Sequence, residues 1–217
     1  MGVCNGFAIP LAHKFGAGDY RGLRAFMVNA IYLSAIFAVV MTAVTVVFCR
    51  PILELMRTPD NIIDGAYLYI VIIFAGIPAT YLYNLISAII RSMGDSKTPV
   101  VFLVISSVMN IALDLVFIIN LHLGVAGASL ATVISQAVSG IGCLIYSWKK
   151  FEILHPDAEE RRWNSSYMKT LCGMGVPMGL QYSITAIGSV ILQSAVNTLG
   201  SNAVASMTAG SKIGMRK

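Results

Sequence analysis

The sequence carries little charge. Only 12% of its 217 residues are Asp, Glu, Lys or Arg and 57% are hydrophobic, whereas about a quarter of the residues in a soluble domain are charged. No charged residue occurs in residues 25–49, 65–90, 122–148 and 170–211. About 20 apolar residues cross the hydrocarbon core of a bilayer, so each stretch is long enough to span it. A chain of this size could not bury so much apolar surface in one soluble core.

The sequence also lacks the motifs of common enzymes. It contains no HExxH, no GxSxG and no Walker-type phosphate loop. An intramembrane aspartyl protease needs two facing Asp residues, and only Asp114 lies within an apolar stretch. We therefore expect neither an enzyme nor a resident cofactor.

Paired cysteines and a nucleic-acid-binding pattern are missing as well. Cys4, Cys49, Cys143 and Cys172 form no CxxC pair, and three of them lie in or beside apolar stretches, so we interpret them as packing residues. The net charge of +5 comes from basic residues near the ends of apolar stretches, as membrane topology requires. It therefore does not indicate a nucleic-acid partner.

The pattern of apolar stretches predicts an all-α fold, a polytopic bundle of transmembrane helices. Five full spans are expected, with a partial segment at residues 2–15 and another beginning near Asn202. The full spans are residues 25–49, 65–90, 99–121, 124–147 and 171–198. The first segment is too short to cross a bilayer. We therefore expect a truncated chain, and a small protein with interfacial ends is the alternative.

Basic residues alternate between the loops. The loops at residues 14–24, 91–97 and 148–169 hold ten Lys or Arg, whereas the intervening loops hold only Arg50 and Arg57. Because cytoplasmic loops carry the excess of Lys and Arg, we expect these three loops in the cytoplasm. The predicted location is the plasma membrane, of the bacterial inner-membrane type.

Polar residues inside the spans are informative because they cost free energy there. A charged Asp at the bilayer centre costs about 3 kcal/mol, so Asp114 is expected to face a cavity or a partner. Asn110 lies one turn before Asp114 on the same helical face. Asn84 and Thr132 belong to similar polar stripes on the neighbouring spans. Their oxygens suit a hard cation or a proton-carrying carboxylate, and hydrogen bonding between helices is the alternative.

The last full span carries a longer polar stripe. Its members are spaced by four residues: Gln181, Thr185, Ser189, Gln193 and Asn197. Five polar side chains on one helical face cannot point into lipid. A neutral polar wall predicts a substrate path, and packing against another helix is the alternative.

Two prolines lie in the middle of predicted spans. Pro78 follows Gly76, and Pro177 lies between Gly175 and Gly179. Proline removes a backbone donor and kinks a helix. Beside polar stripes these kinks predict hinges, although kinks are also ordinary in membrane helices.

Three segments resemble the MATE (multidrug and toxic compound extrusion) family. Residues 6–19 (GFAIPLAHKFGAGD) resemble the end of that family's second helix and the turn after it. Residues 91–99 (RSMGDSKTP) resemble the turn between its fourth and fifth helices, and residues 124–132 (GVAGASLAT) resemble the opening of its sixth. The basic loop 148–169 is similar to the linker between the two lobes. The resemblance covers nearly the whole chain.

The resemblance implies a division into parts of a larger protein. A full-length member has twelve helices in two lobes. Residues 1–147 would then be N-lobe helices, with the first helix missing and the second partial. Residues 148–169 would form the cytoplasmic inter-lobe loop, and residues 170–217 would begin the C-lobe.

The resemblance also implies a cation site. In one branch of the family this site lies inside the N-lobe, and its positions match Asn84, Asn110, Asp114 and Thr132. That site also uses an aspartate on the first helix, which this chain lacks. Another branch relies on a glutamate after the seventh-helix proline, and residues 179–188 contain no acid.

The implied function is a cation-coupled antiporter that exports cationic or amphipathic organic compounds by alternating access. The coupling ion, H⁺ or Na⁺, would bind at the four residues above, and no other cofactor is expected. The implied partners are the lipid bilayer and a small organic substrate, with the full-length parent a monomer. A lipid-linked oligosaccharide flippase of the same superfamily is one alternative, and a non-transporting truncated remnant is another.

Overall fold

The all-α prediction is confirmed. The structure, a computed structural model, describes residues 2–55 and 60–198, and these form helices joined by short connections without any strand. The segment expected near Asn202 lies outside the described residues. The helices are α1 (Gly2–Gly16), α2 (Tyr20–Leu55), α3 (Asp60–Ala75), α4 (Ile77–Ser92), α5 (Lys97–Leu115), α6 (Gly124–Lys150) and α7 (Ser165–Thr198). A π-helical turn, η1 (Val116–Asn120), extends α5, and a short 3₁₀ helix, η2 (Glu152–Leu154), follows α6.

Five helical segments in the described residues are long and apolar enough to cross a membrane. They are Tyr20–Glu54, Ile63–Ser92, Lys97–Asn120, Gly124–Lys150 and Ser165–Val196, and they coincide with the five full spans predicted from the sequence. Many of their apolar side chains point outward, including Val108 and Val190, which are 63% and 69% exposed. Such continuous apolar surface is unusual on a soluble monomer, so the chain is a multi-pass membrane protein.

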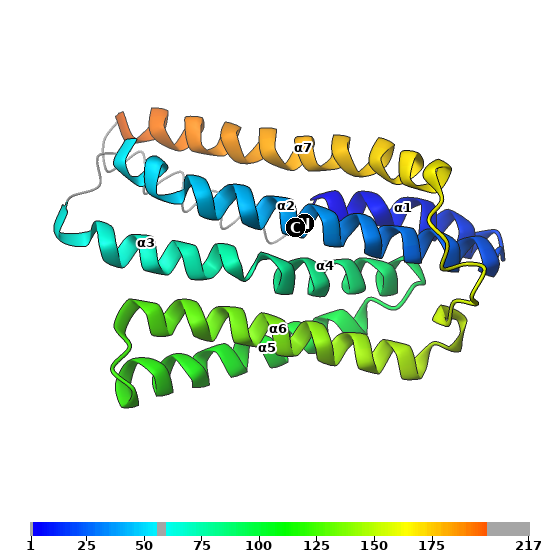
Figure 1. Ribbon diagram of the computed structural model, residues 1–217, viewed down its shortest axis with the longest axis horizontal. Coiled ribbons are helices and arrows are strands. Elements are labelled where there is room, and N and C mark those ends of the chain that lie inside the picture. The colour runs from blue at the N-terminus through cyan, green and yellow to red at the C-terminus, as the bar shows by residue number, and fades with distance from the viewer. Residues whose placement is uncertain (1, 56–59, 199–217) are drawn as a thin grey trace.

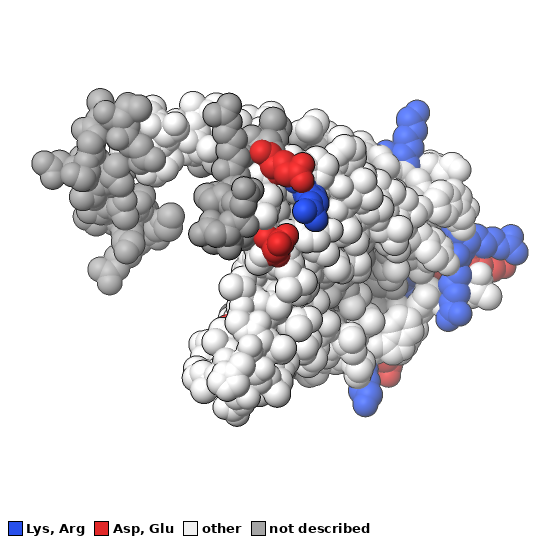
Figure 2. All heavy atoms as spheres, turned by 60° about the vertical axis from the view of Figure 1, so that its left-hand side comes forward, with Lys and Arg blue, Asp and Glu red and all other residues white. Residues whose placement is uncertain are grey.

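The helices lie along one long axis (Figure 1), where α3 and α4 continue one another in the same direction and the other sequence neighbours run antiparallel. The α1–α2 turn, the α4–α5 turn and the α6–α7 loop meet at one end of the bundle, which we call the basic end, and the α5–α6 connection lies at the opposite end. Figure 2 shows most of the Lys and Arg side chains gathered at this end, with a largely uncharged surface between the two ends. The three loops with excess positive charge therefore share one side.

Helix α1 lies inside the bundle and organises the core at the basic end. Phe7 and Leu11 of α1 are almost completely buried, as is Leu23 of α2. Ile90 of α4 and Leu171 of α7 join the same apolar cluster. Although α1 is short, its side chains thus link helices from both ends of the sequence.

Glycines allow α1 and α7 to approach very closely. An ideal Cβ built on Gly6 would lie 2.6 Å from both the Cα of Gly175 and the carbonyl oxygen of Met174. One built on Gly2 would lie 2.7 Å from the carbonyl oxygen of Met178. Small residues spaced by four permit such backbone contact between membrane helices.

The predicted span 65–90 is divided at the glycine that precedes Pro78. Helix α3 ends at Ala75 and α4 begins at Ile77, with Gly76 between them packed against Val133 of α6. Pro78 therefore occupies the first turn of α4, where a missing backbone N–H leaves no hydrogen bond unmade. Pro177, in contrast, lies within α7, which continues through it.

Helix α7 begins before the span predicted at 171. The Oδ1 atom of Asn164 accepts hydrogen bonds from the backbone N–H groups of Ser166 at 2.9 Å and Tyr167 at 3.4 Å. Asparagine is a favoured N-cap because it satisfies these free donors. Hydropathy alone missed the first turns of the helix because they lie among polar residues.

Candidate cation and substrate sites

The structure brings together two of the predicted cation-site residues through the packing of α5 on α6. The Nδ2 atom of Asn110 donates to the Oγ1 atom of Thr132 at 3.4 Å. The hydroxyl of Thr132 in turn donates to the carbonyl oxygen of Ala128 at 3.0 Å. The first bond uses one of the two side-chain amide hydrogens of Asn110 and leaves its side-chain carbonyl oxygen available to a cation.

Asp114 lies one helical turn beyond Asn110, just before η1 begins. Its carboxylate is half-buried, and its Oδ1 atom is shielded from solvent with no hydrogen-bond partner in the described part of the chain. A buried carboxylate oxygen without a partner is costly, so such a group normally serves a ligand or a proton. The observation fits the predicted role of Asp114.

Asn84 lies apart from the other three residues in this conformation. Its Nδ2 atom donates to the carbonyl oxygen of Thr80 in its own helix at 2.8 Å. The neighbouring Tyr83 faces Gly140 of α6, whose ideal Cβ would lie 3.3 Å from the backbone nitrogen of Tyr83. Gly140 is two helical turns beyond Thr132, roughly 12 Å along the axis. Asn84 is therefore closer to the basic end, and its share in the site stays a prediction.

The predicted substrate path follows an open groove on one face of α7, and all the described residues that line this groove belong to α7. Gln181, Thr185 and Ser189 line this groove of about 480 Å³, together with Met178, Tyr182 and Ala186. The hydroxyls of Thr185 and Ser189 each donate to a carbonyl one turn earlier, at 2.9 Å. Their hydrogen bonds are thus satisfied within the helix, while their oxygens face the groove. Gln193 continues the same helical face beyond it.

The two halves of α7 lie in different surroundings. The first half is packed against the bundle, with Met168 and Leu171 buried. Past Tyr182 the helix is exposed through Ala195. At the boundary, Asn5 of α1 donates to the hydroxyl of Tyr182 at 3.3 Å and accepts from Arg91 at 3.2 Å. The half of α7 nearer the basic end is therefore packed against α1, whereas the half beyond Tyr182 is exposed.

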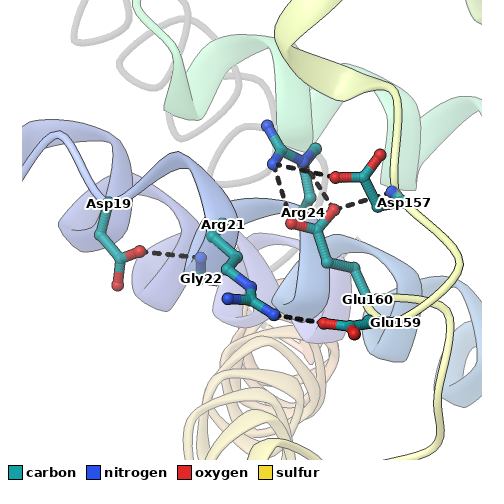
Figure 3. Close-up of polar contacts among 7 residues, drawn as sticks. All are labelled: Asp19, Arg21, Gly22, Arg24, Asp157, Glu159 and Glu160. Atoms are coloured by element: carbon teal, nitrogen blue, oxygen red, sulfur yellow. Dashed lines mark hydrogen bonds and ion pairs between the residues drawn. The ribbon is translucent and has the colours of Figure 1, made fainter.

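A polar cluster at the basic end was not predicted from the sequence (Figure 3). Arg24 at the start of α2 donates two hydrogen bonds to Glu160 of the α6–α7 loop, from Nε to Oε2 at 2.7 Å and from Nη2 to Oε1 at 2.8 Å. The Oε2 atom of Glu160 also accepts from the backbone N–H of Asp157 at 2.9 Å. The Arg24 guanidinium is the main reason that the pKa of Glu160 lies below its ordinary value.

Asn29 reinforces this attachment from inside the bundle. It is fully buried, and its Oδ1 atom accepts from the backbone N–H of Asn164 at 3.0 Å. Its Nδ2 atom donates to the carbonyl oxygens of Ala25 at 2.8 Å and Arg162 at 3.4 Å. In the sequence, the signal for this role is that Asn29 is a single amide side chain near the start of the charge-free stretch 25–49.

Comparisons with known proteins agree with one another. The MatE family model matches residues 1–116. The probable multidrug resistance protein YoeA of Bacillus subtilis is 31% identical over 212 residues, which are 94% of this chain and 46% of the relative. The probable multidrug resistance protein YpnP of the same organism is 30% identical, over 94% of this chain and 45% of the relative.

A solved structure described as MATE in the bent conformation superposes with a TM-score of 0.88 at 26% identity. The match covers 99% of this chain and 48% of that one. The chain thus spans about half the length of the relatives and structures that it matches.

Proposed function

This chain belongs to the MatE family, and from that membership we propose that it is the cation-binding part of an exporter of small organic compounds. The family is one of transporters, which argues against an enzyme. The proposed mechanism is antiport: H⁺ or Na⁺ binds within the bundle, and a cationic or amphipathic compound leaves in exchange.

The observation that carries the proposal is the arrangement around Asp114. One carboxylate oxygen is shielded and unpartnered, and the Asn110–Thr132 pair lies one turn away on the packed faces of α5 and α6. Carboxylate, amide and hydroxyl oxygens are the ligands of hard cations. An ionisable group in a membrane span is also a functional candidate by default.

The shape of α7 supports alternating access. Its first half is held against α1 by glycine contacts, and its second half borders an open groove. We propose that this state admits a substrate only from the end opposite the basic end. Cation binding shifts the equilibrium between two conformations only if the cation binds one of them more tightly than the other. We propose that the contact between α1 and α7 opens in the second conformation.

We further propose that the basic end faces the cytoplasm across a plasma membrane. The support is that all three loops with excess Lys and Arg meet there (Figure 2), as the positive-inside rule requires. The groove along α7 would then open to the outside. We expect the full-length protein to act as a monomer.

The test is ethidium efflux from vesicles that contain the full-length protein in which this chain occurs. An imposed proton or Na⁺ gradient drives efflux, and comparing the two gradients identifies the coupling ion. We expect Asp114→Asn to abolish gradient-driven efflux while the amount of protein in the membrane is unchanged. Asp64→Asn is the control, because Asp64 is an exposed acid on α3. Normal efflux by the Asp114 variant would overturn the proposal.

A further inference from the structure

A second polar pocket lies at the basic end, on a different side from the Arg24 cluster. It is a hollow of about 660 Å³ between the α4–α5 turn and the last turn of α6. Its lining combines charged, hydroxyl and apolar side chains, among them Asp95, Lys97, Thr98, Val101, Tyr146 and Lys150. The cation and substrate sites do not include any of these residues.

The acidic side chain that lines this pocket, Asp95, already has hydrogen-bond and ion-pair partners within the protein. Asp95 caps α5, because its Oδ1 atom accepts from the backbone N–H groups of Lys97 at 3.1 Å and Thr98 at 3.0 Å. Its Oδ2 atom accepts from the ammonium of Lys150 at 2.8 Å. Lys150 and the helix cap hold the pKa of Asp95 far below its ordinary value, so the carboxylate is charged at neutral pH.

The two basic residues that line the pocket, Lys97 and Lys150, outnumber its one acidic residue, Asp95. Lys97 is exposed and has no acidic partner among the described residues. The ammonium of Lys150 also lies 5.4 Å from the centre of the Tyr146 ring, close enough for a cation–π contact. The pocket therefore keeps a surplus positive charge on its rim, which favours an anion.

The wall of the pocket is apolar and faces outward. Val101 is 55% exposed and Tyr146 is 44% exposed, and both lie on membrane-spanning helices. Lys97 is the first residue of α5 and Lys150 the last of α6, so the basic rim lies where two spans leave the membrane. Aromatic and basic side chains at this depth are typical of the headgroup region.

We propose that this pocket binds an anionic phospholipid. Lys97 and Lys150 contact the phosphate, and the acyl chains lie along Val101 and Phe102 below the rim. A soluble phosphate would satisfy the basic rim but leave the apolar wall unused, whereas a phospholipid matches both. The inference rests on the membrane location of the chain and not on cation coupling.

The first experiment compares lipids by native mass spectrometry of the purified full chain in detergent. The probes are phosphatidylglycerol and phosphatidylcholine with identical acyl chains, with glycerol 3-phosphate as a soluble competitor. We expect selective retention of phosphatidylglycerol that glycerol 3-phosphate does not displace. Equal retention of both lipids would overturn the proposal. Displacement by an equimolar amount of the soluble phosphate would assign the pocket to a soluble anion and overturn it as well.

Two variants are expected to change the affinity for phosphatidylglycerol in opposite directions. Lys97→Gln should weaken phosphatidylglycerol binding about fivefold, the change expected for one basic residue near an anionic surface. Asp95→Asn should strengthen it, because the amide oxygen can still cap α5 while Lys150 is released from its ion pair. A merely structural role for Asp95 would lower stability without raising lipid affinity.

The matched control is Lys169→Gln, which removes the same charge from an exposed position on α7 at the basic end. It should leave selective binding unchanged. If Lys97→Gln and Lys169→Gln weaken binding equally, the attraction is general and the pocket is not the site. A melting temperature recorded for each variant confirms that the fold is retained.

Discussion

Arg24 on α2 and Glu160 in the α6–α7 loop form a two-pronged ion pair that attaches the loop before α7 to α2. The carboxylate is almost fully enclosed, with a side-chain exposure of 3% against 20% for the arginine. A fork-shaped guanidinium matches a carboxylate in both distance and direction. The pair therefore holds the α6–α7 loop against the start of α2.

We predict that Glu160→Ala lowers the free energy of unfolding by about 2–3 kcal/mol, because it leaves a largely buried guanidinium without its partner. The neighbouring Glu159→Ala is the control. Its pair with Arg21 is more than 70% exposed on both sides, and such surface pairs contribute less than about 1 kcal/mol. Denaturation in detergent, followed by tryptophan fluorescence, measures both. Equal losses would contradict the ranking by burial.

Acidification should release the loop from α2. Because Arg24 lowers the pKa of Glu160 below its ordinary value of 4.5, the pair contributes its full stabilisation at neutral pH. This contribution is lost as pH falls through the folded-state pKa. Trp163 of the loop stacks on Tyr32 of α2, so its fluorescence reports the attachment. We expect Glu160→Gln to lack this acid transition, and an identical transition in the variant would assign it to other groups.

The close approach of α1 and α7 should tolerate no added methyl group at Gly6. In Gly6→Ala the new Cβ would meet backbone atoms of α7 at 2.6 Å, so the helices must separate. We expect a loss of about 1–3 kcal/mol in unfolding free energy, the usual cost of overpacking. Gly173→Ala on α7 is the control, since no atom lies within 4 Å of its ideal Cβ. A smaller loss at Gly6 than at Gly173 would contradict the packing.

The polar face of α7 should be accessible to water, and the adjacent apolar face should not. In a background without the four native cysteines, we predict that Ser189→Cys reacts with a membrane-impermeant maleimide at least tenfold faster than Val190→Cys. Ser189 lines the groove, whereas Val190 points outward with 69% exposure and should meet lipid. The maleimide reacts with the thiolate, which forms in water, whereas a thiol in hydrocarbon stays protonated. Equal rates would argue that the stripe packs against another helix.

The sequence predicts the spans well because one large free-energy cost, that of placing charge in the bilayer, decides where they lie. Burying charge in a bilayer is so unfavourable that the gaps between charged residues predicted the positions of four of the five full spans. The span 99–121 was predicted from its hydropathy, because it contains Asp114. The prediction was less precise at the helix ends. Helix α7 starts at Ser165 because the side chain of Asn164 caps it, a local hydrogen bond that hydropathy does not register.

The candidate sites were predictable in composition but not in geometry. Periodicity placed Asn110 and Asp114 on one face of α5, and the structure adds that Thr132 meets this face. The same reasoning grouped Asn84 with them, yet the register of α4 against α6 places it about two turns away. Register depends on which residues fit together between helices, such as the Val133 side chain against the backbone of Gly76, and no single helix contains that information.

The sequence by itself determined that this is a multi-pass helical membrane protein with its basic loops on one side. Those properties follow from the free energy of transfer of each segment taken separately. Only the tertiary structure decided that Arg24 meets Glu160, that Gly6 meets Gly175, and that one half of α7 is packed against the bundle while the other half is exposed. These features join residues far apart in the chain, and their energies arise only when helix packing brings the atoms within contact distance.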